Sequence, residues 1–291
     1  MGKILIIADK GDSCVATSRG LELARKLGHS AEVVAFIHED VGRLTSNKTE
    51  QNNFKERLLE RRREQVEARI AESSKDGQRV ALKVVWMRDV HLWVNKRAAS
   101  TKFAAVVKTS HGSGGVIYTS TDWHLLRECS APILMAAENK WHRTRPVLAA
   151  LDLGTKNKNK QALNSKILGE AKALADTLGV ELKIIAAIEI PALLSDLDLV
   201  DPISYTKEHK AEMMPHLKAL AAEHGVSEKI FTIKRGPVDK VITSQAAKAR
   251  AQIVVLGTVA RRGFRAKLVG NTAEAVLQHL RTDVLALKPD A

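Results

Sequence analysis

Short apolar runs alternate with longer, mainly polar segments along the whole 291-residue chain. Runs of this length that do not alternate with polar residues are typical of strands covered on both faces, and the segments between them are long enough for crossover helices. The pattern therefore predicts an α/β protein with parallel sheets. The runs are Ile4–Ala8, Val33–Ile37, Ala81–Trp86, Ala104–Val107 and Ile133–Ala136, then Val147–Leu151, Leu182–Ile188, Ile230–Ile233, Ile253–Leu256 and Val284–Leu287.

The second five runs repeat the order of the first five, which indicates a tandem duplication with its junction near Glu138–Pro146. We therefore expect two domains, residues 1–140 and 141–291. Each is predicted to be a five-stranded parallel sheet with strand order 3-2-1-4-5. In such a sheet a ligand crevice lies beyond the carboxyl ends of strands one and four, where the order reverses.

The second domain places candidate ligand-binding residues at this crevice. Asp152 follows its first strand, and Gly257 ends its fourth. A carboxylate there can accept hydrogen bonds from a ribose or base, while the N–H groups that start the next helix attract a phosphate. Asp152 is equally consistent with a simple strand end and Gly257 with a turn. The candidate residues are Asp152, Leu256, Gly257, Val259, Ala260, Gly270, Asn271 and Thr272.

Basic side chains on both sides of the crevice add positive potential. They are Lys156, Lys158, Arg261, Arg262, Arg265 and Lys267.

Helix signals support the predicted order of elements. Thr121 or Asp122 is expected to cap one helix and Asn271 or Thr272 another, while Pro237 is expected to start a third. A long amphipathic helix is predicted over Asn52–Ser74, with its three arginines, 61–63, on a solvated face rather than in a nucleic-acid-binding arm.

The net charge is the one unusual feature of the composition. The chain carries a formal charge of +13 and has a pI near 9.8, so its surface attracts anions of many kinds. Only 4% of residues are aromatic, and the basic stretches lack interleaved rings, which disfavours single-strand nucleic-acid binding. No apolar stretch approaches a membrane span, and no secretory leader is evident, so a cytoplasmic location is expected.

Neither the cysteines nor the histidines form a recognisable reactive site. Cys14 and Cys129 lack metal-ligand spacing and are expected to be reduced thiols. The ten histidines show no paired ligand spacing, so no metal site is expected. The sequence contains no nucleophile elbow and no Walker motif. We therefore expect at most weak ATP hydrolysis.

An insertion follows the second strand of the second domain. Ile188–Tyr205 is rich in leucine and acidic residues. One interpretation is a surface loop packed by its own leucines. The alternative is an apolar roof over a cleft between the two halves, which would bind an apolar or lipid-like small molecule.

The loop after Gly257 resembles the universal stress protein family. Nucleotide-binding members carry Gly-x2-Gly-x9-Gly-Ser/Thr, which falls here on Gly257, Ala260, Gly270 and Asn271: two glycines are kept and two positions differ. The strings TDWHLLR, KVVW and GNTAEAVLQHLRTDVLALKPD resemble tandem members of that family. The resemblance covers essentially the whole chain.

The resemblance implies the adenine nucleotide alpha-hydrolase-like fold, a stress-response role and tolerance of DNA-damaging conditions. It also implies that the two domains pair through their fifth strands as a pseudo-dimer, with a further homodimer possible in principle. Ala260 adds a methyl group where the backbone can require a positive φ, which costs a non-glycine residue about 1 kcal/mol or more. A weakened ATP site, with or without Mg²⁺, is therefore expected in the second domain.

The first domain is expected to bind no nucleotide. Alignment places Lys108 opposite Gly257 and Thr119 opposite Gly270, so both anchoring glycines are missing. The expected function is thus a non-enzymatic stress-response protein with one degenerate site. A nucleotide or an amphiphile is its expected ligand.

Overall fold

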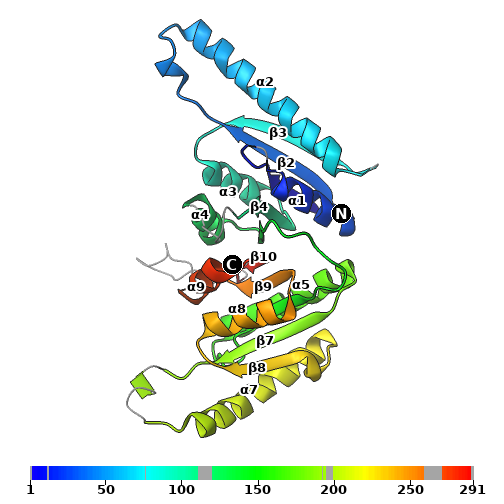
Figure 1. Cartoon of the computed structure of the whole chain (residues 1–291), viewed down its shortest axis with the longest axis vertical. Helices are drawn as coiled ribbons and strands as arrows, with labels where there is room; N and C mark the ends of the chain where they lie inside the picture. The colour runs from blue at the N-terminus through cyan, green and yellow to red at the C-terminus, as the bar shows by residue number, and fades with distance from the viewer. Residues whose placement is uncertain are drawn as a thin grey trace. The chain divides into compact units, whose positions relative to one another are not determined.

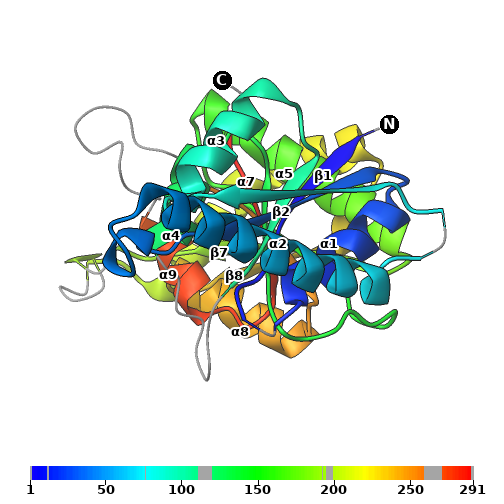
Figure 2. The same ribbon diagram turned by 90° about the horizontal axis from the view of Figure 1, so that it is seen from above.

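The chain forms two α/β units, shown in Figure 1 and, turned by 90°, in Figure 2. The structure is a computed structural model, and it describes residues 2–11, 13–75, 77–110, 120–191, 193–194, 199–258 and 271–289. One compact unit, unit 1, extends to Glu138, and the other, unit 2, starts at Asn139.

Unit 1 contains a parallel sheet in the order β3-β2-β1-β4-β5, which is the order expected from the sequence. Its helices α1 and α2 lie against β1, β2 and β3, while α3 packs on α4. The strands are β1 Lys3–Ile7, β2 Ser30–Ile37, β3 Val80–Trp86, β4 Ala105–Thr109 and β5 Ile133–Ala136. The helices are α1 Val15–Lys26, η1 Val41–Arg43, α2 Lys48–Ser73, α3 Val90–Ser100 and α4 Ser120–Glu128.

Unit 2 repeats this arrangement in the order β8-β7-β6-β9-β10, again with parallel pairs. Helix α5 lies against β6 and β9, α8 contacts both β7 and α9, and α7 packs on α5. The strands are β6 Val147–Ala150, β7 Leu182–Ile188, β8 Phe231–Arg235, β9 Ile253–Gly257 and β10 Asp283–Leu287. The helices are α5 Lys158–Leu178, α7 Pro202–His224, η2 Glu228–Ile230, α8 Val238–Ala249 and α9 Asn271–His279.

The central strands explain why the sequence carries continuous apolar runs. Ile4, Leu5 and Ile6 of β1 are fully buried, as are the side chains of Val254 and Val255 in β9. Helices cover both faces of these strands, so neither face offers a place for a polar side chain. The core of each unit therefore follows directly from the pattern of apolar residues.

Three local predictions are wrong. Asp122 and Thr121 lie in the first turn of α4 rather than ahead of it, and α9 begins at Asn271, so Asn271 and Thr272 also lie inside a first turn. Arg62, expected on a solvated face, is only 6% exposed. Pro237 does precede α8 as expected.

The insertion is shorter than predicted, because α7 starts at Pro202. Leu193 and Leu199, expected to pack against the loop itself or to cover a ligand, are 68% and 62% exposed, and Ile203 in the first turn of α7 is 74% exposed. Residues 192 and 195–198 of the insertion lie outside the described residues.

Candidate functional site

The carboxyl ends of β6 and β9 meet in unit 2, because these two strands are neighbours in the sheet. Val147 pairs with Ile253 and Ala149 with Val255, so Asp152 and Gly257 leave the sheet at the same edge. This is the point at which the strand order reverses. Leu256, just before Gly257, is buried.

The remaining predicted site residues are described only in part. Val259, Ala260 and Gly270 lie outside the described residues, as do the four basic residues predicted between them, Arg261, Arg262, Arg265 and Lys267. Asn271 and Thr272 form the first turn of α9.

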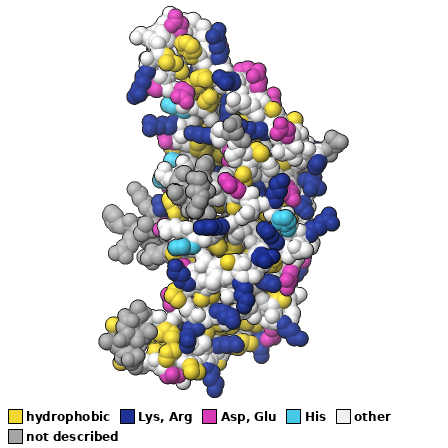
Figure 3. All heavy atoms as spheres, viewed as in Figure 1, with side chains coloured by type: hydrophobic (Ala, Val, Ile, Leu, Met, Phe, Trp, Pro, Cys, Tyr) yellow, Lys and Arg dark blue, Asp and Glu magenta, His cyan; other side chains and the backbone are white. Residues whose placement is uncertain are grey.

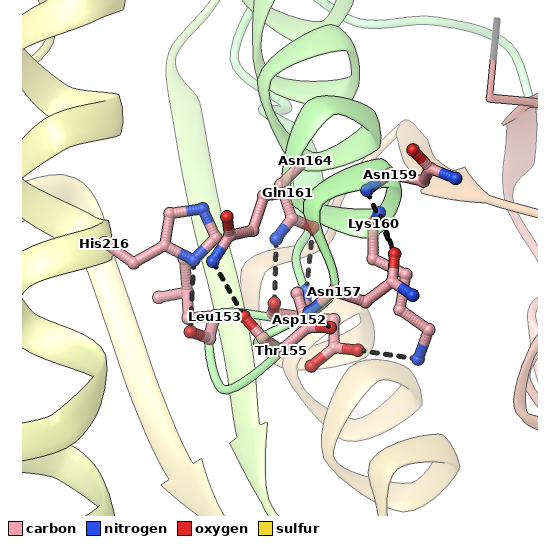
Figure 4. A network of polar contacts seen from close by, with 9 residues as sticks. All are labelled: Asp152, Leu153, Thr155, Asn157, Asn159, Lys160, Gln161, Asn164 and His216. Carbon is pink, nitrogen blue, oxygen red and sulfur yellow. Dashed lines mark hydrogen bonds and ion pairs between the residues drawn. The ribbon is translucent and has the colours of Figure 1, made fainter.

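The loop between β6 and α5 is fixed by a buried asparagine (Figure 4). Asn164 Oδ1 accepts a hydrogen bond from the backbone N–H of Asp152 (3.0 Å), and its Nδ2 donates to the carbonyl of the same residue (2.7 Å). Asn164 is only 2% exposed. Both backbone polar groups of Asp152 are thus satisfied from α5, which holds the residue in place.

A second asparagine caps α5. Asn157 Oδ1 accepts from the N–H groups of Asn159 (3.0 Å) and Lys160 (3.2 Å), as Figure 4 shows. Gln161 Nε2 donates to the carbonyl of Thr155 (3.0 Å) and so fixes the turn before the cap. The helix N-terminus is therefore satisfied without any contribution from Asp152.

The Asp152 carboxylate consequently faces solvent. Its side chain is 56% exposed, and its one ion pair among the described residues joins Oδ2 to Lys160 Nζ at 3.2 Å. An exposed pair of this kind contributes little to stability and can be exchanged for a ligand. The carboxylate can then accept from hydroxyl or N–H groups, while the ammonium can contact an anion.

Gly257 has a structural reason for lacking a side chain. A Cβ placed there would lie 2.6 Å from Leu163 Cδ2 and 3.1 Å from Ile167 Cδ1, both on α5. A side chain here would force Leu163 to move, so the close packing of β9 on α5 favours glycine, whichever ligand the unit binds. It is not needed for a turn, since it is the last residue of β9.

Helix α7 supports the loop from its other side. His216 Nδ1 lies 3.2 Å from the carbonyl oxygen of Leu153, and Met213 packs beside Gly154. In Figure 4 the His216 ring faces the loop from the neighbouring helix. The β6–α5 loop is therefore held between two helices, which keeps the position of Asp152 well defined.

Backbone hydrogen bonds identify the counterparts of these residues in unit 1. Ala8 N bonds to Val34 O (2.9 Å) as Leu151 N bonds to Ile185 O (3.0 Å), so Asp9 corresponds to Asp152.

The fourth strands are matched in the same way. Ser110 N bonds to Ala136 O (2.9 Å) as Thr258 N bonds to Leu287 O (2.7 Å), so Thr109 corresponds to Gly257 and Lys108 to Leu256. The predicted alignment of Lys108 with Gly257 is therefore wrong by one residue. Thr119 and its predicted counterpart Gly270 both lie outside the described residues.

The counterpart carboxylate in unit 1 serves as a helix cap. Ala16 N, at the start of α1, donates to Asp9 Oδ2 (3.1 Å) and to Thr109 Oγ1 (2.9 Å). Cys14, the N-cap residue of α1, makes no side-chain capping bond. Asp9 is accordingly 6% exposed as a whole residue.

Two arginines of α2 cover the same loop. Arg62 and Arg69 both donate to the carbonyl of Asp9, and Arg69 also donates to the carbonyls of Gly11 and Ser13. Burial and the nearby charge of Arg69 lower the pKa of the Arg62 guanidinium, and the Asp9 carboxylate opposes that shift. The guanidinium groups thus cover the loop that contains Asp9, whereas α7 places Met213 and His216 beside the equivalent loop of unit 2.

A buried ion pair joins the next two elements of unit 1. Lys108 Nζ, at the end of β4, lies 2.6 Å from Asp122 Oδ1 in the first turn of α4, and both side chains are almost fully buried. The corresponding residues of unit 2 are Leu256 and Ala273, the third residue of α9. Unit 1 therefore places its own carboxylate at the helix start where an anion would bind.

Sequence reasoning placed Asp152 and Gly257 at the same end of the sheet but did not identify the contacts of Asn157, Lys160 and Asn164. The signal for Asn157 was available, since asparagine directly before a helical segment is a common N-cap. The pairing of Asn164 with Asp152 depends on the packing of α5 and has no local signal. Lys156 and Lys158, predicted beside the crevice, precede Lys160 in the same segment.

Metal and membrane signals are also lacking in the described part of the chain. No group of three or more His, Cys, Asp or Glu side chains among the described residues could hold a metal ion. None of the helices described is long and apolar enough to cross a lipid bilayer.

Comparisons with known proteins agree with the duplicated fold. The model of the universal stress protein family matches residues 144–288. Universal stress protein E of Escherichia coli K12 is 28% identical over 99% of this chain and 93% of its own, and the Salmonella typhi protein of the same name is 28% identical over 99% and 94%.

Two solved structures extend over both units. A functionally unknown protein from Pseudomonas aeruginosa PAO1 superposes with a TM-score of 0.73 at 25% identity, covering 99% of this chain and 92% of its own. A universal stress protein from Archaeoglobus fulgidus DSM 4304 shares the fold with a TM-score of 0.68 at 17% identity, covering 98% of each chain. The chain therefore belongs to the universal stress protein family, as a tandem member with two units of the family fold.

Proposed function

We propose that the chain is a non-enzymatic stress-response protein that binds ATP, or a related anionic ligand, in unit 2 alone. The observation that carries the proposal is the difference between the two equivalent carboxylates. The Asp152 side chain is 56% exposed beside Lys160, whereas Asp9 is buried, caps α1 and lies under Arg62. Only unit 2 offers a carboxylate to a ligand at this position.

The chemistry of the unit 2 crevice fits a nucleotide. Asp152 can accept from ribose hydroxyls, Lys160 can contact phosphate, and the N-terminus of α9 supplies N–H groups and the positive end of a helix dipole. The motif that starts at Gly257 supports adenine nucleotide as the ligand class. Mg²⁺ would accompany the phosphates rather than occupy a protein site of its own.

Calorimetric titration with ATP, with and without Mg²⁺, tests the proposal. The wild-type chain is expected to bind ATP with a dissociation constant in the millimolar range or below. Asp152→Asn is expected to weaken binding about ten- to a hundredfold, because a hydrogen bond to a charged group contributes about 1.5–3 kcal/mol. No heat of binding at millimolar ATP would remove the proposal.

Asp176→Asn is the matched control. Like Asp152, Asp176 is an exposed carboxylate paired with a lysine, but it lies within α5. Its Oδ2 is 2.7 Å from Lys172 Nζ, and its side chain is 65% exposed. Each substitution changes the net charge by the same amount, so equal effects on ATP binding would indicate general electrostatics instead of a contact with Asp152.

A gain-of-function variant tests the role of the motif. Ala260→Gly restores the second motif glycine and is expected to strengthen ATP binding by up to about tenfold, since a positive φ costs a non-glycine residue about 1 kcal/mol or more. Unchanged affinity would show that this position does not limit binding.

A second candidate function is binding of an apolar or lipid-like small molecule. It is favoured by the exposure of Leu193, Leu199 and Ile203, three large apolar side chains close together in sequence. Mass spectrometry of an organic extract of the purified protein is expected to find a copurifying amphiphile, with less of it after Leu199→Ser. Extracts that contain none would count against this function.

A further inference from the structure

Unit 2 contains a second hollow at the opposite, amino ends of its strands. This cavity has a volume of about 420 Å³. Its walls come from the segment before β6, the residues just before β9 and β10, and the C-terminal ends of α8 and α9. A volume of this size is in the range that accommodates small molecules. The crevice at Asp152 lies at the carboxyl ends of the same strands, so the two sites are separate.

Four cationic side chains line the cavity, and no acidic residue does. The cations are Lys140, Arg145, Arg250 and Arg281. Within the described part of the chain, none of them forms an ion pair with a carboxylate. Arg97 of unit 1, by contrast, is paired with Glu32 at 2.7 Å. Lys and Arg side chains are spread widely over the face shown in Figure 3. The four cations named above differ in that they line a single cavity.

Arg250 adopts a backbone conformation that usually belongs to glycine. It ends α8 in the left-handed region with φ 50° and ψ 40°, whereas Gly179 and Gly225 hold the same position after α5 and α7 with φ 66° and 61°. Among the described residues it is the one non-glycine with positive φ. Such conformations are costly for a side-chain-bearing residue and tend to be found at functional sites.

The walls of the cavity are held in place by hydrogen bonds. Trp141 Nε1 donates to Asp283 Oδ2 (2.8 Å), Asn139 Nδ2 donates to the carbonyl of Arg281 (3.0 Å), and the N–H of His142 donates to Gln252 Oε1 (2.8 Å). Each of these bonds fixes the segment before β6 against the body of unit 2. The cations that this segment contributes are therefore positioned by the fold.

The backbone carbonyls near the rim already have partners. Thr282 Oγ1 lies 2.8 Å from Ala251 O and 2.7 Å from Gln252 O. Cations near the C-terminal ends of helices are also favoured by the helix dipole, which accounts for Arg250 and Arg281. It does not account for Lys140 and Arg145, which come from the segment before β6. A ligand with negative charge is the simplest common partner for all four.

We propose that this cavity binds a compact small molecule carrying two or more phosphate groups. Guanidinium groups bind phosphate oxygens in a bidentate manner, and an ammonium adds a point charge. Ala246, Ala247 and Leu280 form an apolar part of the lining that suits a non-polar portion of the ligand. This proposal is independent of ATP binding at Asp152.

Titration calorimetry with inorganic tripolyphosphate at low salt tests the proposal on the full chain. Tripolyphosphate is expected to bind at least about tenfold more tightly than orthophosphate, since it can contact several of the cations at once. Arg250→Gly removes the guanidinium while placing the favoured residue in the left-handed position. It is expected to fold at least as stably as the wild type and to weaken tripolyphosphate binding roughly tenfold.

Lys248→Gln is the matched control, because Lys248 is on the same helix, is exposed and does not line the cavity. It lowers the net charge by the same amount and is expected to change affinity less than about twofold. Asp152→Asn should leave tripolyphosphate binding at the cavity intact. The proposal is overturned if the wild type does not bind tripolyphosphate, if Arg250→Gly binds like the wild type, or if Lys248→Gln loses as much affinity.

Discussion

The equivalent crevices of the two units differ in which residue caps the helix that follows the first strand. In unit 1 Asp9 accepts from the N-terminus of α1, since Cys14 makes no capping bond. In unit 2 Asn157 caps α5, and the Asp152 carboxylate remains exposed. One capping residue thus decides whether the neighbouring carboxylate is structural or available to a ligand. Duplicated folds can separate stability from binding by such an exchange.

The largest effect is expected from breaking the ion pair that is specific to unit 1. Lys108→Leu leaves the fully buried Asp122 without this partner and should destabilise unit 1 by about 3–5 kcal/mol. Adding Asp122→Ala reproduces the Leu256 and Ala273 pair of unit 2 and should recover most of the loss. Chemical denaturation followed by tryptophan fluorescence measures this, because three of the four tryptophans precede Glu138. A double variant as unstable as the single one would refute the explanation.

A second cluster without a counterpart in unit 2 makes unit 1 sensitive to acid. Glu32 accepts from Arg97 at 2.7 and 2.9 Å, with Lys3 and Lys83 nearby, and its counterpart by strand register is Lys183. Burial opposes ionisation, but the Arg97 hydrogen bonds and the three positive charges hold the pKa of Glu32 below its usual value.

Because the folded-state pKa is lowered, the stabilisation is present above the unfolded-state pKa, near 4.5, and is lost as pH falls through the folded value. Glu32→Gln should cost about 2–3 kcal/mol at pH 7, as expected for charged hydrogen bonds. The difference in unfolding free energy between the wild type and Glu32→Gln should become smaller below about pH 4.5. A difference that stays constant down to about pH 3 would contradict the lowered pKa of Glu32.

Removing the asparagine that holds Asp152 tests the rigidity of the unit 2 crevice. Asn164→Ala deletes both hydrogen bonds to the Asp152 backbone and should cost about 1–3 kcal/mol. The Asp152 amide should then exchange with deuterium faster. Asn159→Ala is the control, because the Asn159 side chain is exposed and makes no bond to that loop among the described contacts. Equal exchange rates in all three proteins would argue against this role.

The smallest effect concerns the caps themselves. Asn157→Ala should cost about 1 kcal/mol, the usual effect of losing an N-cap, while Cys14→Asn should stabilise unit 1 by up to a similar amount. If Asp152 takes over capping when Asn157 is lost, ATP affinity should also fall. Thermal unfolding and ATP titration of both variants measure these changes. An Asn157→Ala variant more stable than the wild type, or a Cys14→Asn variant less stable, would refute the capping roles given to these positions.

The sequence was sufficient to predict the duplication, the parallel sheets and the convergence of Asp152 and Gly257. These features follow from apolar runs and from the geometry of parallel sheets, which depend little on individual side chains. The burial of Arg62 could not be predicted, because an arginine on a polar helix face can extend along the surface or reach inward to a carbonyl. The packing requirement at Gly257 depends on Leu163, which is far away in sequence.

A crystal soaked with ATP would test the central claim most directly. Our account predicts nucleotide density at the carboxyl ends of β6 and β9, with Asp152 in contact with the sugar or base, and none beside Asp9. Nucleotide bound next to Asp9, or an empty crevice at Asp152 when ATP is held elsewhere in the chain, would contradict it.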